Sequence, residues 1–184
     1  MAAGRVTLRD VFDRVPDGEG SLLRKAALPQ AVPAMLATLT EERFSRPDWI
    51  FERKLDGVRC LARHDAQGPV RLLSRNDKDM SRTYPEIVEA IAANAPPETI
   101  LDGEVVAFDG RRTSFERLQG RLGLSDPTVA RATGIPVFYY VFDVLFASGY
   151  DVRRLPLLTR KKVLRDAVTF GGPLRYTTHR IGAG

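Results

Sequence analysis

Residues 137–146, with the sequence Val-Phe-Tyr-Tyr-Val-Phe-Asp-Val-Leu-Phe, form the most apolar run of the 184-residue chain. Valine, tyrosine and phenylalanine dominate the run, and these residue types favour β-strands. A strand that is apolar on both faces is typical of the middle of a sheet. The run is too short to cross a bilayer, and no run in the sequence is long enough to do so. The sequence therefore predicts a domain built on a sheet, with this strand near its centre.

Shorter strand and helix patterns alternate along the rest of the chain. Ile87 and Ile91, with Val88 beside them, recur at helical spacing. Ser114 is a suitable N-cap for a second helix. The order of the elements predicts an α+β fold in which most strands form an antiparallel meander. The predicted strands are 49–55, 58–63, 70–75, 100–108 and 174–181; the predicted helices are 84–95, a helix after Ser114 with Phe115, Leu118 and Leu122 on one face, and 156–168 with a basic face.

The N-terminal part of the chain has a different character. Residues 1–30 are polar and punctuated by glycine and proline, with a short helix expected near residues 8–12. We therefore expect an N-terminal arm or linker over residues 1–30 and a single domain over residues 31–184. The first residues lack the apolar core of a signal peptide, and Cys60 is the only cysteine, so it has no partner for an internal disulfide. These features indicate a reducing, cytoplasmic location.

The chain carries a formal net charge of +5. Such a charge favours a polyanionic partner, although an arginine-rich, well-solvated surface explains it equally well. Two histidines and one cysteine are too few for a zinc site. The composition therefore leaves a nucleic acid or nucleotide as one class of partner and excludes a zinc centre.

Lys54-Leu55-Asp56-Gly57-Val58-Arg59 is the stretch with the clearest chemical content. Asp-Gly between two alternating apolar runs is a strong hairpin signal, but a hairpin requires neither Lys54 nor Arg59. In an extended strand Glu52, Lys54 and Asp56 share one face, either as an exposed ion-paired surface or around a lysine nucleophile. Neighbouring carboxylates stabilise an ammonium, whereas a bound divalent metal opposes it. As a nucleophile motif, the stretch therefore makes better chemical sense with a bound metal–nucleotide complex than alone.

Asp102-Gly103-Glu104 is a second candidate. Both carboxylates fall on one face of a predicted strand, and Gly103 allows a close approach to the backbone. The pair could hold a metal, bind a ribose hydroxyl, or simply form the polar edge of a strand.

Two smaller candidates complete the set. Asp143 lies inside the most apolar run, so it needs a partner or a function, because an unpaired buried carboxylate is costly. Its neighbour Phe142 faces the other way and could stack on a base. Arg75, at the end of a predicted strand in Ser-Arg-Asn, is either a phosphate ligand or a solvated arginine.

In chain order the four motifs are Lys-x-Asp-Gly-x-Arg, then Ser-Arg-Asn, then Asp-Gly-Glu, then Phe-Asp. Together they resemble the covalent nucleotidyltransferase superfamily, which contains DNA ligases, RNA ligases and mRNA capping enzymes. The resemblance covers roughly residues 33–165. It implies an antiparallel-sheet ligase adenylation fold, similar to ATP-grasp, within the α+β class. The segments most similar to bacterial ATP-dependent DNA ligases of the D and C types are Pro33-x-Met35-Leu36-Ala37, Trp49-x-Phe51-Glu52-x-Lys54, Thr83-Tyr84-Pro85-Glu86 and Ser114-Phe115-x-x-Leu118-Gln119-x-Arg121.

The resemblance implies a role for each motif residue. Lys54 would attack the α-phosphate of ATP to form lysyl-AMP, with Mg²⁺ or Mn²⁺ as the metal. AMP would then pass to the 5′-phosphate of nicked or broken double-stranded DNA, and the adjacent 3′-hydroxyl would displace it. The other implied roles are Glu52 for the adenine amine, Arg59 and Glu104 for the ribose, Phe142 for stacking on adenine, Arg75 for a phosphate, Asp56 and Gly57 for the shape of the nucleophile loop, and Glu104 or Asp102 for the metal or its waters.

The sequence departs from the family pattern in two places. Asp77 follows Ser-Arg-Asn where the resembling ligases usually have glycine. The family also has a later glutamate-glycine segment and a Lys-x-Lys pair, usually before an OB-fold domain, whereas the last glutamate here is Glu116 and the last lysine is Lys162. The resemblance therefore implies a domain that is incomplete at its C-terminus, without an OB-fold domain, as a cut piece or a shortened natural product. We expect weak or no self-adenylation by such a chain alone.

Other functions remain open at this point. The basic charge and the missing motifs also fit a non-catalytic remnant of a ligase that binds nucleic acid or nucleotide. An RNA ligase or capping-type nucleotidyltransferase would share the same motifs. In the DNA ligase interpretation the partners are DNA and end-joining proteins rather than a membrane, and the setting is DNA repair at the bacterial nucleoid.

Overall fold

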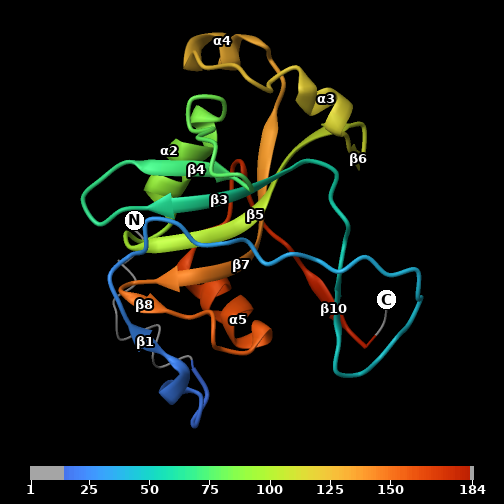
Figure 1. The fold of residues 1–184 in the computed structure, drawn as a ribbon. Coiled ribbons are helices and arrows are strands. Elements are labelled where there is room, and N and C mark those ends of the chain that lie inside the picture. The colour runs from blue at the N-terminus through green and yellow to red at the C-terminus, as the bar shows by residue number, and fades with distance from the viewer. Residues whose placement is uncertain (1–14, 183–184) are drawn as a thin grey trace.

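The computed structural model describes residues 15–182 (Figure 1). The helix expected near residues 8–12 lies outside the described residues. No helix within residues 15–182 is long and apolar enough to span a membrane. The elements are η1 (Gly20–Leu22), β1 (Arg24–Lys25), β2 (Ile50–Glu52), β3 (Val58–His64), β4 (Val70–Ser74), α2 (Pro85–Asn94), β5 (Thr99–Asp109), β6 (Arg112–Thr113), α3 (Phe115–Gln119), α4 (Pro127–Ala132), β7 (Val137–Ala147), β8 (Tyr150–Asp151), α5 (Leu157–Ala167), β9 (Leu174–Tyr176) and β10 (His179–Ile181).

A twisted sheet with the strand order β1-β8-β7-β5-β3-β4 forms the centre of the molecule (Figure 1). The apolar run is β7, which lies inside the sheet between β5 and the strands β8 and β9. All pairs in the sheet are antiparallel except β7 with β9. The predicted central strand and the largely antiparallel order are therefore confirmed.

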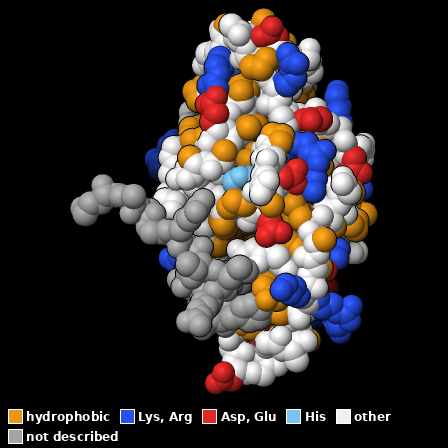
Figure 2. Space-filling model, turned by 90° about the vertical axis from the view of Figure 1, so that its left-hand side faces the viewer, with side chains coloured by type: hydrophobic (Ala, Val, Ile, Leu, Met, Phe, Trp, Pro, Cys, Tyr) orange, Lys and Arg blue, Asp and Glu red, His pale blue; other side chains and the backbone are white. Residues whose placement is uncertain are grey.

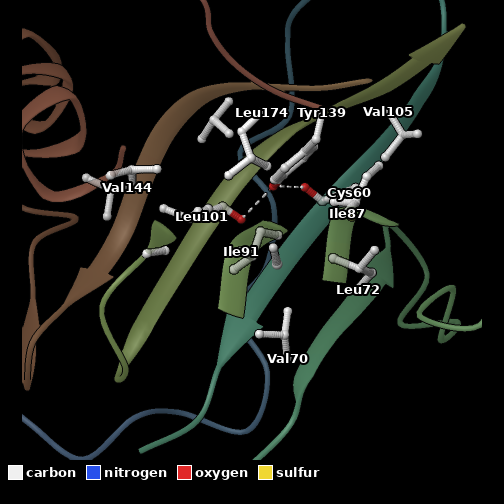
Figure 3. Close-up of a cluster of buried hydrophobic side chains, with 14 of the residues drawn as sticks. Cys60, Val70, Leu72, Ile87, Ile91, Leu101, Val105, Tyr139, Val144 and Leu174 are labelled. Carbon is white, nitrogen blue, oxygen red and sulfur yellow. Dashed lines mark hydrogen bonds between the residues drawn. The ribbon is translucent and has the colours of Figure 1, made fainter. Parts of the chain in front are cut away.

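The main core joins the sheet to α2 and α5; Figure 3 shows the part of it around Ile87 and Ile91 of α2. Ile87 and Ile91 are fully buried on α2, as their helical spacing predicts. Tyr139 is also fully buried, and its hydroxyl donates to the carbonyl oxygens of Cys60 and Leu101 at 2.9 and 3.2 Å. The single polar atom of this ring is therefore satisfied inside an apolar cluster.

A second, smaller cluster contains Leu61, Ile100 and Phe146. The segment that precedes β2 covers it, with Val32 buried and Leu28 packed against the same residues. This segment runs on over the sheet and brings residues 35–37 to the site described below.

Asp-Gly at residues 56–57 does not form the expected hairpin. β2 ends at Glu52 and pairs with β10, whereas β3 pairs with β4 and β5. Hydrogen bonds draw Asp56 toward the start of α3, so the chain crosses between two sheets instead of folding back. Glu52, Lys54 and Asp56 therefore do not share the face of one strand.

Three further local predictions need correction. The helix after Ser114 begins as predicted, with the Ser114 hydroxyl accepting from the Arg117 N–H at 3.1 Å, but it ends at Gln119 and leaves Leu122 exposed. The segment 174–181 divides into β9 and β10, which belong to different sheets. The basic face predicted for 156–168 is only partly present: Lys162 and Arg165 are exposed on α5, whereas Arg160 and Lys161 are buried.

The surface in Figure 2 carries acidic and basic side chains side by side. Hydrophobic side chains are scattered among them. On this face, therefore, the net charge of +5 is not gathered into one basic patch.

Candidate functional site

Lys54 lies in the exposed loop between β2 and β3. Two contacts of Asp56 hold this loop: its N–H donates to the Thr113 hydroxyl, and its Oδ2 accepts from the Phe115 N–H, both at 3.1 Å. Gly57 is packed so closely on β5 that a Cβ atom would lie 2.1 Å from the Val105 carbonyl oxygen. A side chain at position 57 would displace the loop, so Asp56 and Gly57 together fix where Lys54 stands.

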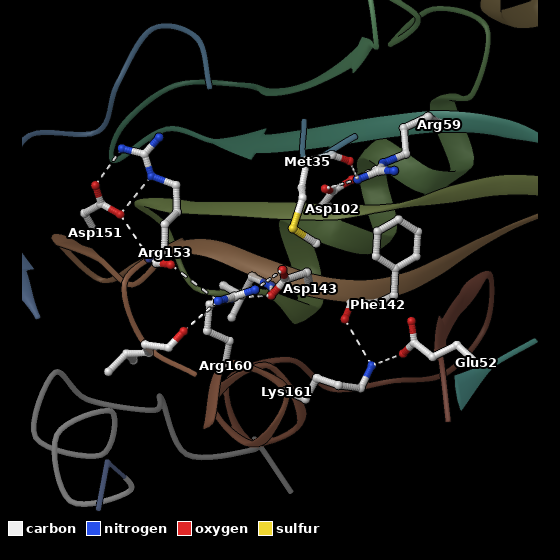
Figure 4. Close-up of polar contacts among 12 residues, drawn as sticks. Met35, Glu52, Arg59, Asp102, Phe142, Asp143, Asp151, Arg153, Arg160 and Lys161 are labelled. Atoms are coloured by element: carbon white, nitrogen blue, oxygen red, sulfur yellow. Dashed lines mark hydrogen bonds and ion pairs between the residues drawn. The ribbon is translucent and has the colours of Figure 1, made fainter. Parts of the chain in front are cut away.

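Arg59 lies on β3, directly after the loop that contains Lys54. Its Nε and Nη2 donate to the two carboxylate oxygens of Asp102 at 2.7 and 2.6 Å, and Nη2 also donates to the Met35 carbonyl oxygen at 3.2 Å (Figure 4). The Asp102 side chain is 1% exposed and that of Arg59 is 27% exposed. Both Asp102 oxygens accept hydrogen bonds from Arg59, so this buried carboxylate fixes the orientation of the Arg59 guanidinium.

Gly103 separates Asp102 from Glu104 on β5. A Cβ at this glycine would lie 2.5 Å from both the Tyr139 ring and the Tyr140 carbonyl oxygen. The close approach expected at Gly103 is therefore made by β7.

Glu104 lies opposite Arg59 in the register of β3 and β5. Burial raises the pKa of Glu104, while the charges of Arg59 and Lys54 and the N–H of Gly57 lower it. Burial outweighs these contacts, and the net pKa lies above the ordinary value of 4.5. At neutral pH the ionised Glu104 carboxylate therefore lowers the free energy of unfolding, although Lys54 and Arg59 lie beside it.

We expect Glu104→Gln to stabilise the protein at neutral pH, because the amide keeps the size of the side chain and removes the buried charge. A carboxyl with a raised pKa in the folded state is destabilising above that pKa, and the penalty disappears as the pH falls below 4.5. Urea unfolding of both proteins across this range measures the difference. A gap that widens as the pH falls would contradict this account.

Phe142 is half-buried on β7, and the Arg59 guanidinium carbon lies 4.7 Å from its ring centroid. A guanidinium and an aromatic ring in this arrangement attract each other. The ring borders a cavity of about 360 Å³ that is lined by Met35, Leu36, Ala37, Glu52, Arg53, Lys54, Leu55, Arg59, Glu104, Phe142 and Thr177. Five residues singled out from the sequence, from four separate segments, thus surround one cavity.

Arg75 does not line this cavity. It is exposed in the turn that follows β4. The structure therefore places it as a surface arginine, apart from the other candidate residues.

Two buried cations of α5 were not identified from the sequence as site residues. Lys161 contacts the Glu52 carboxylate and donates to the carbonyl oxygens of Phe142 and Thr177 at 3.1 and 3.2 Å (Figure 4). Arg160 donates from Nε and Nη2 to the two oxygens of Asp143 at 2.9 and 2.8 Å. Asp143 thus has the partner that its apolar surroundings require.

Asp77, at the position where glycine was expected, has a φ of 56°. The Ser74 hydroxyl accepts from the N–H groups of Asn76 and Lys78 at 3.3 and 3.1 Å, which closes the turn around it. Asp77 therefore keeps the left-handed conformation that glycine adopts freely and aspartate tolerates.

Asp77→Val is expected to destabilise the protein by about 1–2 kcal/mol, because a β-branched side chain clashes with the backbone at positive φ. Asp77→Gly should stay within about 1 kcal/mol of the parent protein. Urea unfolding measures both. Lys78→Val is the control, since Lys78 is exposed and has no positive φ; an equal loss in that variant would point to valine itself rather than to the backbone.

Residues 15–182 contain no group of three or more His, Cys, Asp or Glu side chains that could hold a metal ion. Mg²⁺, however, is often held by one or two carboxylates together with phosphates and waters. Glu104 fits that pattern, because it lines the cavity, whereas Asp102 is occupied by Arg59.

Comparison with known proteins adds independent evidence. The family model of the ATP dependent DNA ligase domain matches residues 31–181. The chain is similar to a "Probable DNA ligase" of Koribacter versatilis, with 32% identity over 92% of this chain and 29% of that protein. It is also similar to the "Bifunctional non-homologous end joining protein LigD" of Bacillus subtilis, with 39% identity over 66% of this chain and 21% of that protein.

A solved structure of a mycobacterial DNA ligase D complexed with ATP and MES matches with a TM-score of 0.58 and 28% identity. The match covers 77% of this chain and 43% of that one. The chain thus spans less than a third of these two curated relatives and less than half of the solved structure. The predicted α+β, antiparallel-sheet fold of a ligase adenylation domain is confirmed.

Proposed function

The chain belongs to the family of ATP-dependent DNA ligase domains, and on that premise we propose that it binds ATP in the Lys54 cavity and carries AMP on Lys54 for the joining of DNA. One observation supports the proposal above the others: Glu52, Lys54, Arg59, Glu104 and Phe142 surround a single cavity of about 360 Å³. The mycobacterial ligase D complexed with ATP shows that a protein of this fold takes this nucleotide.

The walls of the cavity suit the parts of ATP. Phe142 offers a ring face for adenine, and base–aromatic stacking contributes about 1–3 kcal/mol. The Glu52 carboxylate accepts hydrogen bonds but donates none, so it suits the exocyclic amine of adenine. Glu104 and Arg59 lie together on the sheet, as an acceptor and a donor for the ribose hydroxyls. Lys54 is then left at the end where the phosphates would lie.

The first reaction takes place at the Lys54 amine. Nζ, as the neutral amine, attacks the α-phosphorus of ATP; an N–P bond forms, the bond to the bridging oxygen breaks, pyrophosphate leaves, and the nitrogen gives up one proton to the leaving pyrophosphate or to water. Glu104, together with the phosphates, would hold Mg²⁺ or Mn²⁺, and the metal would supply positive charge that offsets the charge of the phosphates. Asp56 and Gly57 fix the loop that carries Lys54 and so keep the lysine beside the cavity.

The later steps transfer AMP to DNA. An oxygen of the DNA 5′-phosphate attacks the adenylate phosphorus; the N–P bond breaks, the Lys54 nitrogen takes up a proton as it leaves, and a DNA–adenylate forms. The 3′-hydroxyl of the neighbouring strand end then attacks the 5′-phosphate, which seals the nick and releases AMP. Arg75 is proposed to contact the 5′-phosphate, since a guanidinium binds phosphate oxygens with two donors. The nicked or broken DNA, the end-joining partners and a cytoplasmic setting near the nucleoid belong to this same proposal.

Two measurements test the proposal. Calorimetric titration of the whole chain with ATP and with GTP measures binding, and preference for ATP is expected. Incubation with Mg²⁺ and ATP labelled on the α-phosphate, followed by peptide mapping, locates the adduct. AMP on the peptide that contains Lys54 supports the proposal, whereas an absence of ATP binding, or an adduct on another residue, contradicts it.

A further inference from the structure

Lys161 is among the most deeply buried charges in the described part of the chain, with a side chain that is 2% exposed. Its ammonium has three donors, and three acceptors surround it: the Glu52 carboxylate and the carbonyl oxygens of Phe142 and Thr177 (Figure 4). The Tyr176 ring lies 5.1 Å from the same nitrogen. The ammonium is therefore fully satisfied although its side chain is buried.

All three acceptors belong to residues that line the cavity. Glu52 comes from β2, Phe142 from β7, and Thr177 from the segment between β9 and β10. Lys161 itself does not line the cavity. A single buried side chain of α5 thus joins three walls of the cavity from behind.

The contact with Glu52 fixes the orientation of its carboxylate. Lys161 binds Oε1, while the Glu52 side chain remains 28% exposed. A carboxylate has lone pairs on both oxygens, so Oε2 remains able to accept a hydrogen bond from a ligand in the cavity. The rotamers of an unrestrained glutamate would place this oxygen elsewhere for part of the time.

We propose that Lys161 is a positioning residue that sets the choice of adenine over guanine, by holding the Glu52 carboxylate toward the base. An acceptor at this place attracts the exocyclic amine of adenine and repels the carbonyl oxygen that guanine carries at the same ring position. The proposal rests on the proposed function of the cavity as an ATP site. Without Lys161, the Glu52 carboxylate would be less fixed in orientation and would distinguish adenine from guanine less well.

The test compares ATP and GTP binding, by calorimetry, to the whole chain and to two matched variants. Lys161→Met keeps the length of the side chain and removes the ammonium; we expect the ratio of ATP to GTP affinity to fall at least about tenfold. Lys162→Met makes the same change at the next residue of α5, which is exposed, and should leave the ratio unchanged. An unchanged ratio in Lys161→Met would overturn the proposal.

A double-mutant cycle separates positioning from a merely structural role. In a Glu52→Gln background, Lys161→Met should change the ratio by less than about twofold, because the charged group that it positions is already gone. An equal fall in both backgrounds would overturn the proposal. If Lys161→Met does not fold, Lys161→Gln takes its place, since it keeps N–H donors for the two carbonyls, and an unchanged ratio there counts against the proposal equally.

Nucleotide binding by the unaltered chain distinguishes a failure of the proposed function from a failure of the role proposed for Lys161. If it binds neither nucleotide, the proposed function and this inference fail together. If it prefers ATP and the Lys161 variants keep that preference, the proposed function stands and only the role of Lys161 fails.

Discussion

Replacement of Lys54 with alanine is expected to abolish the formation of protein-bound AMP, weak as we expect it to be in this chain, because no other group can take the place of a covalent nucleophile. Non-covalent ATP binding should change by less than about tenfold, since Glu52, Arg59 and Phe142 remain in place around the cavity. Labelled ATP measures the first quantity and calorimetry the second. The contrast between them distinguishes a lost nucleophile from a lost site.

Lys162→Ala is the matched control for this prediction, because it removes one exposed lysine outside the cavity. Its labelling should equal that of the unaltered chain. Equal labelling of the Lys54→Ala protein would exclude Lys54 as the nucleophile. A loss of ATP binding as large as the loss of labelling would show instead that the loop had collapsed.

The largest effect on stability is expected at Arg160. Arg160→Met leaves Asp143, which is 4% exposed, without its cation. Removal of one partner from a buried ion pair costs about 3–5 kcal/mol, because the other charge remains in an apolar environment. The bidentate geometry at 2.9 and 2.8 Å makes this pair a strong case. Urea unfolding at neutral pH measures the loss.

The chain contains a matched control for Arg160. Arg153 forms the same two-pronged contact with Asp151, at 2.9 and 2.6 Å, but its side chain is 44% exposed. Arg153→Met should therefore cost no more than about 1 kcal/mol. Similar losses in the two variants would mean that burial does not determine the strength of these pairs.

The sequence predicted the parts of the site that short-range patterns carry. Lys54, Asp56 and Gly57 stand in one motif, and strand alternation placed Asp102 with Glu104, so a local pattern located each of them. Pairing between strands then brings Arg59 opposite Glu104. The need of Asp143 for a partner was also predictable, because it follows from one carboxylate in an apolar run.

The rest of the site depends on distant contacts. β2 pairs with three residues of β10, and strands this short carry no register signal. Lys161 and Arg160 were assigned to a basic surface because charged residues are usually exposed. A signal was present: Leu157, Arg160 and Leu164 recur at the spacing of one helix face, and Leu164 and Arg160 are both buried. The sequence does not show which acceptors lie next to Arg160 and Lys161 in the fold.

The ribbon of β2 and β10 carries Glu52 on a strand whose partner, His179–Ile181, is remote in the sequence. Residues 53–178, which make up most of the described chain, lie inside the loop that this pairing closes. Contacts of such long range form slowly, because the entropy of loop closure is lost before the pairing contributes. On a ribosome, the wall that bears Glu52 can form only after almost all of the described chain has left the exit tunnel. The wall that bears Glu52 is therefore completed only after the residues of the other cavity walls have emerged.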